Sequence, residues 1–350
     1  MAPDGGTADE NHTGGEPGGR VRVGVIGVGH LGKHHARLLA GMDDAELVAV
    51  ADPREAARDE AAEKFGCRAF ADFQELDGLV DAVSVVVPTR LHAPVAEFFL
   101  ERGVDVLVEK PIAPTAEEGR RMCAAAERHG RILQVGHIER FNPAFGALQE
   151  RGVEPRYVET QRLAPFTFRS TDIGVVLDLM IHDLDLLLAL VDSEVVDVEA
   201  FGGAVFTPAE DMASATLKFA NGAVAHLTAS RVALKPMRRM RVFSRDAYAS
   251  IDFTDRQGVL IRKAPGWDLE KLDVDQVDTS QIDDLWKYVF DGLLTVDRYS
   301  ADERNPLHDE LAAFVRSVRT REAPVVTGED GVRAVEVAHR VLESIRKHPW

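Results

Sequence analysis

A glycine-rich turn directly after the first apolar run constrains the fold most strongly. The run VRVGVIG begins at residue 21 and leads into Gly27, Gly29 and Gly32, which are spaced as GxGxxG and followed by a helical pattern to residue 40. Such glycines allow a tight strand-to-helix turn, let a pyrophosphate approach backbone N–H groups and permit close helix packing. Alone the motif is weak, and a turn without a phosphate is the alternative.

A carboxylate follows at the spacing that completes a dinucleotide site. Asp52 closes the second apolar run, ELVAVAD, and lies 52 − 32 = 20 residues after Gly32, where it can accept hydrogen bonds from ribose hydroxyls. Asp52 repels a 2′-phosphate and so favours NAD over NADP, whereas a guanidinium at Arg54 weakens that preference. The loop residues expected around the pyrophosphate are Gly27, Gly29, His30, Leu31 and Gly32.

The same alternation of apolar runs and helical patterns continues to residue 136. Strand-like runs lie at 81–88, 104–111 and 131–136, and helical patterns lie at 53–65, 92–102 and 115–129. Strands separated by helices and rich in Val, Leu and Ile predict a parallel sheet covered on both faces. We therefore expect an NAD-binding Rossmann domain over residues 21–145.

The pattern changes in the second half of the chain. A long apolar helix is expected at 174–191, followed by strand-like runs at 194–206, 213–220, 223–234, 237–244 and 247–253. Asn221-Gly222 and Arg245-Asp246 are hairpin turns, so this α+β domain, 146–350, should contain an open, mostly antiparallel sheet. Two final helices, roughly 306–320 and 328–347, are expected to pack back on the first domain.

Composition excludes several classes of protein. Residues 1–20 are rich in Gly and acids and predict a disordered tail. The 41 basic and 58 acidic residues give a net charge of −17, which argues against nucleic acid and anionic membranes as partners. Cys67 and Cys123 form no paired framework, so we expect a cytoplasmic protein without disulfides or structural zinc.

Polar residues follow two of the predicted parallel strands. Ligands of open α/β sheets bind at the carboxyl edge of the strands. Pro88, Thr89 and His92 follow one strand and are expected at the cofactor, although Thr89 is equally well explained as a helix N-cap. Glu109 and Lys110 end another strand; the lysine can stabilise alkoxide charge in the cleft, the alternative being a surface salt bridge with Glu109.

The helix at 174–191 carries a narrow polar stripe. At about 100° per residue, Gly174, Asp178, His182 and Asp185 share one face of an otherwise apolar helix. Histidine suits proton transfer near neutrality, so His182 is a candidate general base beside Asp178. A core histidine hydrogen-bonded to aspartate is the simpler alternative. Metal ligation is not expected, because no second histidine shares the spacing.

Three motifs in this order identify a resemblance. GVGHLG, the EKP at 109–111 and the GxxxDxxxHxxD helix at 174–185 resemble the Gfo/Idh/MocA oxidoreductases over about residues 21–347. The resemblance implies that Lys110, Asp178 and His182 are the catalytic set and that the Lys110-Pro111 bond is cis. It also implies a homodimer or homotetramer formed through the open sheet, and a cofactor contact at His137.

Within the family, segments such as VGHIERFNPAF resemble the branch that oxidises the C3 hydroxyl of UDP-N-acetylglucosamine, whose product a PLP-dependent aminotransferase converts to a 3-amino sugar. Guanidinium groups grip phosphate oxygens, so arginines are expected at such a substrate. The candidates are Arg140, Arg162 and Arg169, with Arg231, Arg238, Arg239 and Arg241 on later strands. The alternatives are an inositol or simple sugar dehydrogenase, and a non-catalytic nucleotide-sensing regulator.

Overall fold

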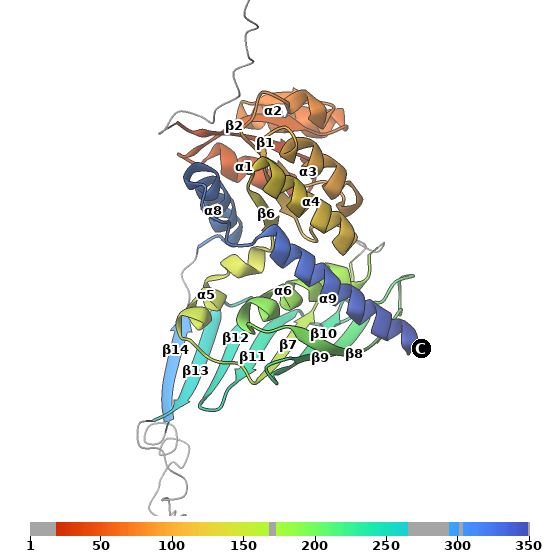
Figure 1. Ribbon diagram of the computed structural model, residues 1–350, viewed down its shortest axis with the longest axis vertical. Helices are drawn as coiled ribbons and strands as arrows, with labels where there is room; N and C mark the ends of the chain where they lie inside the picture. Colours follow the sequence, from red (N-terminus) through yellow and green to blue (C-terminus); the bar gives the residue numbers. More distant parts are fainter. Residues whose placement is uncertain (1–18, 168–172, 265–293, 301–303, 349–350) are drawn as a thin grey trace, which may run out of the picture.

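Two β-sheets and the helices between them form the described part of the chain. A computed structural model describes residues 19–167, 173–264, 294–300 and 304–348. Most of the expected tail, and Arg169, lie outside these residues. Figure 1 shows the N-terminal sheet above, the C-terminal sheet below, and helix α9 (Gly328–Lys347) running between them.

The N-terminal sheet has six strands in the order β3-β2-β1-β4-β5-β6, and every pair is parallel. This order confirms the predicted Rossmann architecture. Its strands are β1 (Val21–Ile26), β2 (Ala45–Ala51), β3 (Arg68–Phe70), β4 (Ala82–Val85), β5 (Asp105–Glu109) and β6 (Leu133–Gly136). Its helices are α1 (Gly32–Ala40), α2 (Glu55–Phe65), α3 (His92–Leu100) and α4 (Ala116–His129).

The C-terminal sheet has eight strands in the order β14-β13-β12-β11-β7-β10-β9-β8. Only the β7–β10 pair among them is parallel, which confirms a mostly antiparallel sheet. The strands are β7 (Tyr157–Leu163), β8 (Val195–Gly203), β9 (Met212–Phe219), β10 (Val224–Ser230), β11 (Met237–Phe243), β12 (Ala247–Asp252), β13 (Gln257–Lys263) and β14 (Leu294–Ser300). Both expected hairpins are present, whereas β7, β13 and β14 were not predicted.

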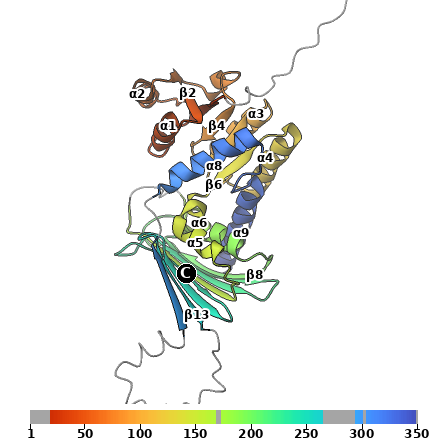
Figure 2. The ribbon, with the colours of Figure 1, turned by 90° about the vertical axis from the view of Figure 1, so that its left-hand side faces the viewer.

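Helices cover one face of the C-terminal sheet. Figure 2 shows α5 (Pro143–Glu150), α6 (Ile181–Leu190) and α9 on the side that faces the Rossmann sheet, with no described helix on the other side. The burial pattern agrees, because alternate residues of the strands are buried and the residues between them are partly exposed. One polar and aromatic face is thus left open.

The expected α-helix at 174–191 begins differently. Val176–Met180 forms a π-helical turn, and the α-helix α6 starts only at Ile181. A π-turn has hydrogen bonds between residues five apart and is wider than an α-helical turn, and such turns are frequent at functional sites. The Asp178 carbonyl accepts from the Lys110 ammonium at 2.8 Å, so the turn opens where the two halves of the chain meet. The uniform stripe expected from 100° spacing is therefore broken.

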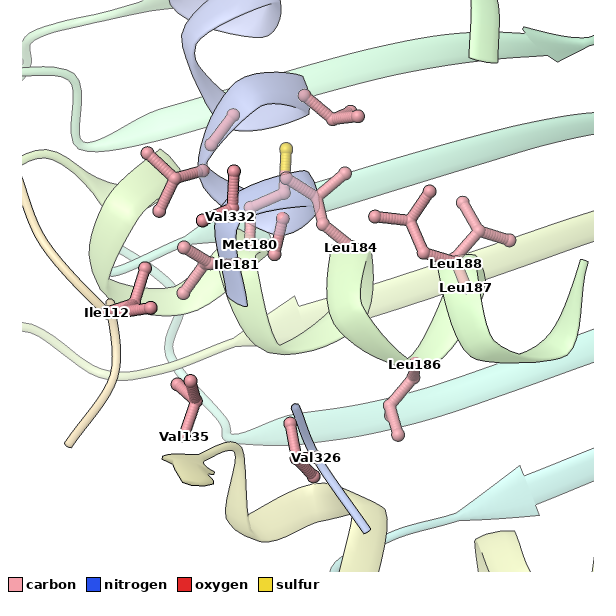
Figure 3. Packing of buried hydrophobic residues seen from close by; sticks show 14 of the residues in the cluster. Ile112, Val135, Met180, Ile181, Leu184, Leu186, Leu187, Leu188, Val326 and Val332 are labelled. Atoms are coloured by element: carbon pink, nitrogen blue, oxygen red, sulfur yellow. The ribbon is translucent and has the colours of Figure 1, made fainter. Parts of the chain in front are cut away.

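The last two helices contact both sheets. Helix α8 (Pro306–Thr320) packs on α1 and β1, while α9 packs on α4 and β6 and also on α6 and β8. Helix α9 packs closely on the Rossmann sheet because Gly331 leaves room for Val135 and Ile112. Figure 3 shows these two side chains in one apolar cluster with side chains of α6. Among the described residues, no helix combines the length and the apolarity needed to cross a membrane.

Alanine at Gly331 should destabilise the protein. Its Cβ would lie 2.8 Å from Val135 Cγ2 and 3.1 Å from Ile112 Cβ, and overpacking of this kind costs about 1–3 kcal/mol against about 1 kcal/mol gained in helix propensity. We expect Tm to fall by about 2–4 °C in thermal unfolding followed by circular dichroism.

Gly146→Ala is the matched control. Gly146 lies in α5 and nothing stands within 4 Å of an added Cβ, so the same change should leave Tm unchanged or raise it. Equal Tm values for Gly331→Ala and the wild type would contradict the close packing of α9.

Candidate functional site

The three residues implied as catalytic come from both halves of the chain. Lys110 follows β5 at the carboxyl edge of the Rossmann sheet, and Asp178 lies in the π-turn before α6. Lys110 Nζ donates to the Asp178 carbonyl at 2.8 Å and lies 3.4 Å from its Oδ1. The Lys110-Pro111 peptide bond is cis, as the resemblance implies. The structure therefore brings the lysine and the helix stripe together.

His182 lies one turn beyond Asp178 and is half-buried. Its Nδ1 is buried and has no hydrogen-bond partner among the described residues. Burial, together with the positive charges of Lys110 and of nearby arginines, lowers the pKa of His182 well below its usual value. A neutral imidazole at physiological pH has a lone pair that can accept a proton.

A second cation reaches Asp178 from the opposite side. Arg231, which follows β10 and is 5% exposed, lies 3.8 Å from Asp178 Oδ2 and 3.9 Å from Asp211 Oδ1, and donates to the Ile173 carbonyl. Asp211 accepts three backbone N–H bonds from the loop before β9, which holds its pKa at about 2 despite its burial. Arg231 thus connects this loop to the Asp178 carboxylate.

Glu109 does not form the surface salt bridge weighed for Lys110. Its carboxylate is turned inward, with Oε1 3.1 Å from His35 Nε2 and Oε2 accepting the Lys110 backbone N–H at 3.2 Å. Burial opposes ionisation, but the His35 imidazole holds the pKa of Glu109 below its usual value. The other ring nitrogen of His35 lies 2.9 Å from Ser84 Oγ. Glu109 therefore fixes the backbone that carries Lys110.

Glu310 of α8 lies near Glu109, and no motif or periodicity in the sequence pointed to it. Its carboxylate is fully buried, and neither oxygen has a hydrogen-bond partner among the described residues. Burial and the nearby charge of Glu109 raise the pKa of Glu310 well above its usual value. This environment therefore favours the protonated, neutral form of the Glu310 carboxyl.

Two arginines expected at a substrate phosphate are instead occupied inside the protein. Arg140 donates to both carboxylate oxygens of Asp185, at 2.8 and 2.9 Å. Arg162 is 3% exposed and donates to Asp183 at 2.7 and 3.1 Å and to Glu139 at 2.8 Å. A buried carboxylate without such a partner is very costly, so these arginines fix α6 in place and have little capacity left for a ligand.

The other arginines considered on the strands face in two directions. Arg239 and Arg241 of β11 lie on the open face of the sheet, 3.6 Å from Asp252 and 3.2 Å from Glu159 respectively. Arg238 points to the opposite side, where its Nη1 lies 3.8 Å from Glu139. This alternation matches the two-residue repeat of a strand.

The glycine loop has the geometry of a dinucleotide-binding turn. Gly27 has φ +88°, and a Cβ on Gly32 would lie 1.8 Å from the Gly27 carbonyl oxygen, so both positions require glycine. A Cβ on Gly29 would instead meet only the end of the Arg54 side chain, at 3.3 Å, which leaves this part of the loop open to a ligand. The loop therefore fits the pyrophosphate of NAD.

Asp52 is held in the place expected for a ribose acceptor. Its carboxylate accepts from the Val28 N–H at 3.0 Å and from Arg54, whose guanidinium bonds both oxygens at 3.0 and 2.9 Å. Burial opposes ionisation, but these donors lower the pKa of Asp52. The Arg54 side chain is 65% exposed and can move away from the carboxylate when a ligand competes for it.

A cavity of about 570 Å³ opens beside this pair, between α1 and α2. Its cationic and imidazole lining is notable in a chain of charge −17. These lining residues are His30, Lys33, His34, Arg37, Arg54 and Lys64. The positive lining suits the phosphate-bearing, adenosine end of a cofactor.

The remaining expected cofactor residues differ in exposure. Pro88 and Leu31 are exposed and Thr89 is partly exposed; Thr89 begins a short 3-10 helix without a side-chain cap, so the N-cap alternative is wrong. His92 is 1% exposed, with its ring nitrogens 2.9 Å from the Val87 and Pro111 carbonyls. His92 therefore links the loop after β4 to the cis-proline segment after β5.

His137 is buried next to α6. It is 1% exposed, its Nδ1 lies 4.0 Å from Asp185, and neither ring nitrogen has a hydrogen-bond partner among the described residues. Burial lowers its pKa, so the ring is neutral at physiological pH. His137 therefore lies at the boundary of the two sheets and not on the exposed cofactor loop.

Known proteins match this chain in both halves. Residues 21–137 match the oxidoreductase family with an NAD-binding Rossmann fold, and residues 151–250 match the GFO/IDH/MocA C-terminal domain. A UDP-N-acetylglucosamine 3-dehydrogenase of Acidithiobacillus ferrooxidans is 47% identical over 234 residues, which are 67% of this chain and 74% of that protein. A myo-inositol 2-dehydrogenase of Thermotoga maritima is 28% identical, over 93% of this chain and 97% of the relative.

Solved structures agree with the sequence matches. The UDP-N-acetylglucosamine 3-dehydrogenase GnnA from Acidithiobacillus ferrooxidans superimposes with a TM-score of 0.82 at 36% identity, covering 94% of this chain and 98% of the other. The identity extends over nearly the whole of both chains. The protein therefore belongs to the Gfo/Idh/MocA family of oxidoreductases, enzymes with an NAD-binding Rossmann fold that act on CH–OH groups.

Proposed function

We propose that this enzyme oxidises the C3 hydroxyl of UDP-N-acetylglucosamine to a ketone, with NAD as the cofactor. The observation that carries the proposal is the 47% identity to a UDP-N-acetylglucosamine 3-dehydrogenase, well above the 28% identity to a myo-inositol 2-dehydrogenase. The contact of Lys110 with the segment that carries Asp178 and His182 supports the same class of reaction.

The residues of the Rossmann edge fit the cofactor. The glycine loop would hold its pyrophosphate and Asp52 its adenosine ribose, and the bound nicotinamide supplies the acceptor for the hydride that leaves the substrate carbon. We favour NAD over NADP because Asp52 is ionised and buried where a 2′-phosphate would approach. The proposed preference for NAD over NADP thus depends on the negative charge of Asp52.

His182 is the proposed general base. Its ring is neutral, and Nε2 is the nitrogen available to the substrate because Nδ1 is buried. When the C3–H bond breaks, the hydroxyl proton passes to His182 Nε2 and the oxygen becomes the carbonyl of the ketone. General-base help of this kind contributes about 10²–10⁴-fold to the rate.

Lys110 is the proposed electrostatic partner of the reacting oxygen. Its ammonium has three donors, and the Asp178 carbonyl occupies one of them at 2.8 Å. Another donor can point to the substrate hydroxyl and stabilise the negative charge that develops on oxygen. Asp178, between Lys110 and Arg231, keeps both cations in place.

One feature of the open sheet face supports an assembly of several subunits. Tyr157, Phe243 and Tyr248 form an aromatic row on the open sheet face, with ring centroids 5.7 and 5.0 Å apart, and we propose that this face joins subunits of a homodimer or homotetramer. The proposed compartment is the cytoplasm, where the 3-keto product would reach a PLP-dependent aminotransferase.

The substrate is tested with a panel read by NADH absorbance. Purified enzyme with NAD should produce NADH and a 3-keto product from UDP-N-acetylglucosamine, and should turn over myo-inositol at least about 100-fold less efficiently in kcat/KM. Activity on myo-inositol with none on the nucleotide sugar would favour the alternative, an inositol dehydrogenase. NAD binding without turnover of any sugar would favour the regulator.

Removing the acid–base groups should slow turnover but not cofactor binding. His182→Ala and Lys110→Ala should each lower kcat by roughly 100-fold or more, with little change in the Kd of NADH measured by fluorescence. Because the pKa of His182 is lowered, its neutral form persists as pH falls, so kcat/KM of the wild type should decline only below about pH 6.5. Wild-type turnover in either variant would remove that residue from the mechanism.

Asp52→Ala should relax the preference for NAD. Loss of the carboxylate removes repulsion of a 2′-phosphate and releases Arg54, so the NADP to NAD ratio of kcat/KM should rise about tenfold. Asp59→Ala is the control, because Asp59 is an exposed carboxylate paired with Arg58 on the same helix. An unchanged ratio in Asp52→Ala would contradict its role as ribose ligand.

A further inference from the structure

We propose that Arg238 forms the subsite for the diphosphate of the substrate and thereby selects nucleotide sugars over uncharged polyols. The inference rests on the proposed function, which requires a cationic group for the substrate phosphates. Of the arginines first expected there, Arg140 and Arg162 are bound to internal carboxylates, and Arg169 lies outside the described residues. Arg238 has the placement and the unused donors that they lack.

The strand register places Arg238 at the catalytic edge of the sheet. It is the second residue of β11 and pairs across the ladder with Arg162 of β7. Met240 and Val242, which share its side of the strand, are fully buried beneath the covering helices. Arg238, Met240 and Val242 therefore lie on the same side of β11, the side covered by helices. Arg238 is nearest the start of the strand, and it is the exposed one of the three.

The guanidinium of Arg238 is open to a ligand. Its side chain is 56% exposed, and its approach to Glu139, at 3.8 Å, is too long for a hydrogen bond. Glu139 already accepts from Arg162 at 2.8 Å and from Asn142 at 3.2 Å. Within the described residues, Arg238 therefore retains the planar set of donors that binds phosphate oxygens in pairs.

The position also suits the chemistry. Arg238 lies 3.8 Å from Glu139, which binds Arg162 together with Asp183, the neighbour of His182 in α6. Its positive charge is one of those that lower the pKa of His182. A diphosphate held by Arg238 would keep the attached sugar ring next to His182 and Lys110. Inositols carry no phosphate and gain nothing from this contact, which makes Arg238 a specificity determinant.

Arg238→Gln and Arg239→Gln form a matched pair, because these neighbours lie on opposite faces of one strand. UDP, which lacks the sugar and cannot be oxidised, is titrated against each protein by calorimetry. We expect Arg238→Gln to weaken UDP binding by about 10- to 100-fold, the effect of losing charge-assisted hydrogen bonds, and Arg239→Gln to leave it unchanged. Arg238→Lys should restore part of the affinity.

Kinetics give the second measurement. With UDP-N-acetylglucosamine, Arg238→Gln should raise KM by about tenfold or more with a much smaller change in kcat, because the contact binds the ground state and transition state alike. Wild-type UDP affinity in Arg238→Gln, or equal losses in both variants, would overturn the subsite. Tight, Arg238-dependent UDP binding without sugar oxidation would support the subsite and refute the proposed reaction.

Discussion

The contact between Lys110 and the Asp178 carbonyl unites the two halves of this protein. The lysine follows a strand of the Rossmann sheet, and the carbonyl belongs to a π-turn that rests on the C-terminal sheet. The donor is charged, so this hydrogen bond contributes more to stability than one between two neutral groups. The chemistry proposed for the site depends on this junction, since neither half carries all the reacting groups.

Buried ion pairs connect α6 to the two neighbouring segments of the chain. Arg140 with Asp185, and Arg162 with Asp183 and Glu139, tie α6 to the segment after β6 and to strand β7. Desolvation offsets much of the attraction in such pairs, but loss of one partner leaves a charge that the interior cannot accommodate. We infer that their main effect is to specify one position for α6, the helix that carries His182.

Local pattern was sufficient for the Rossmann half. Glycine spacing, Asp52 and the alternation of apolar runs predicted a parallel Rossmann sheet with ligands at its carboxyl edge, because each signal reflects contacts within a few tens of residues. Strands β7, β13 and β14 were not predicted. In β7, YVETQRL, polar and charged residues occupy the exposed face of the sheet, so the strand lacks the apolar run that marked the other strands. The π-turn was not predicted, because helical periodicity reports only local spacing, whereas this turn contacts Lys110, 68 residues away in the chain.

The sequence by itself determined the family and the parallel sheet, and its motif spacing proposed Lys110, Asp178 and His182 as the reacting groups. The tertiary structure decided which charges remain available to a ligand. Arg162 and Arg238 are both arginines on strands and pair with each other across a ladder. Arg162 is buried and bound to Asp183 and Glu139, whereas the Arg238 side chain is exposed at the surface. Partners and burial arise from folding, and no local pattern of residues encodes them.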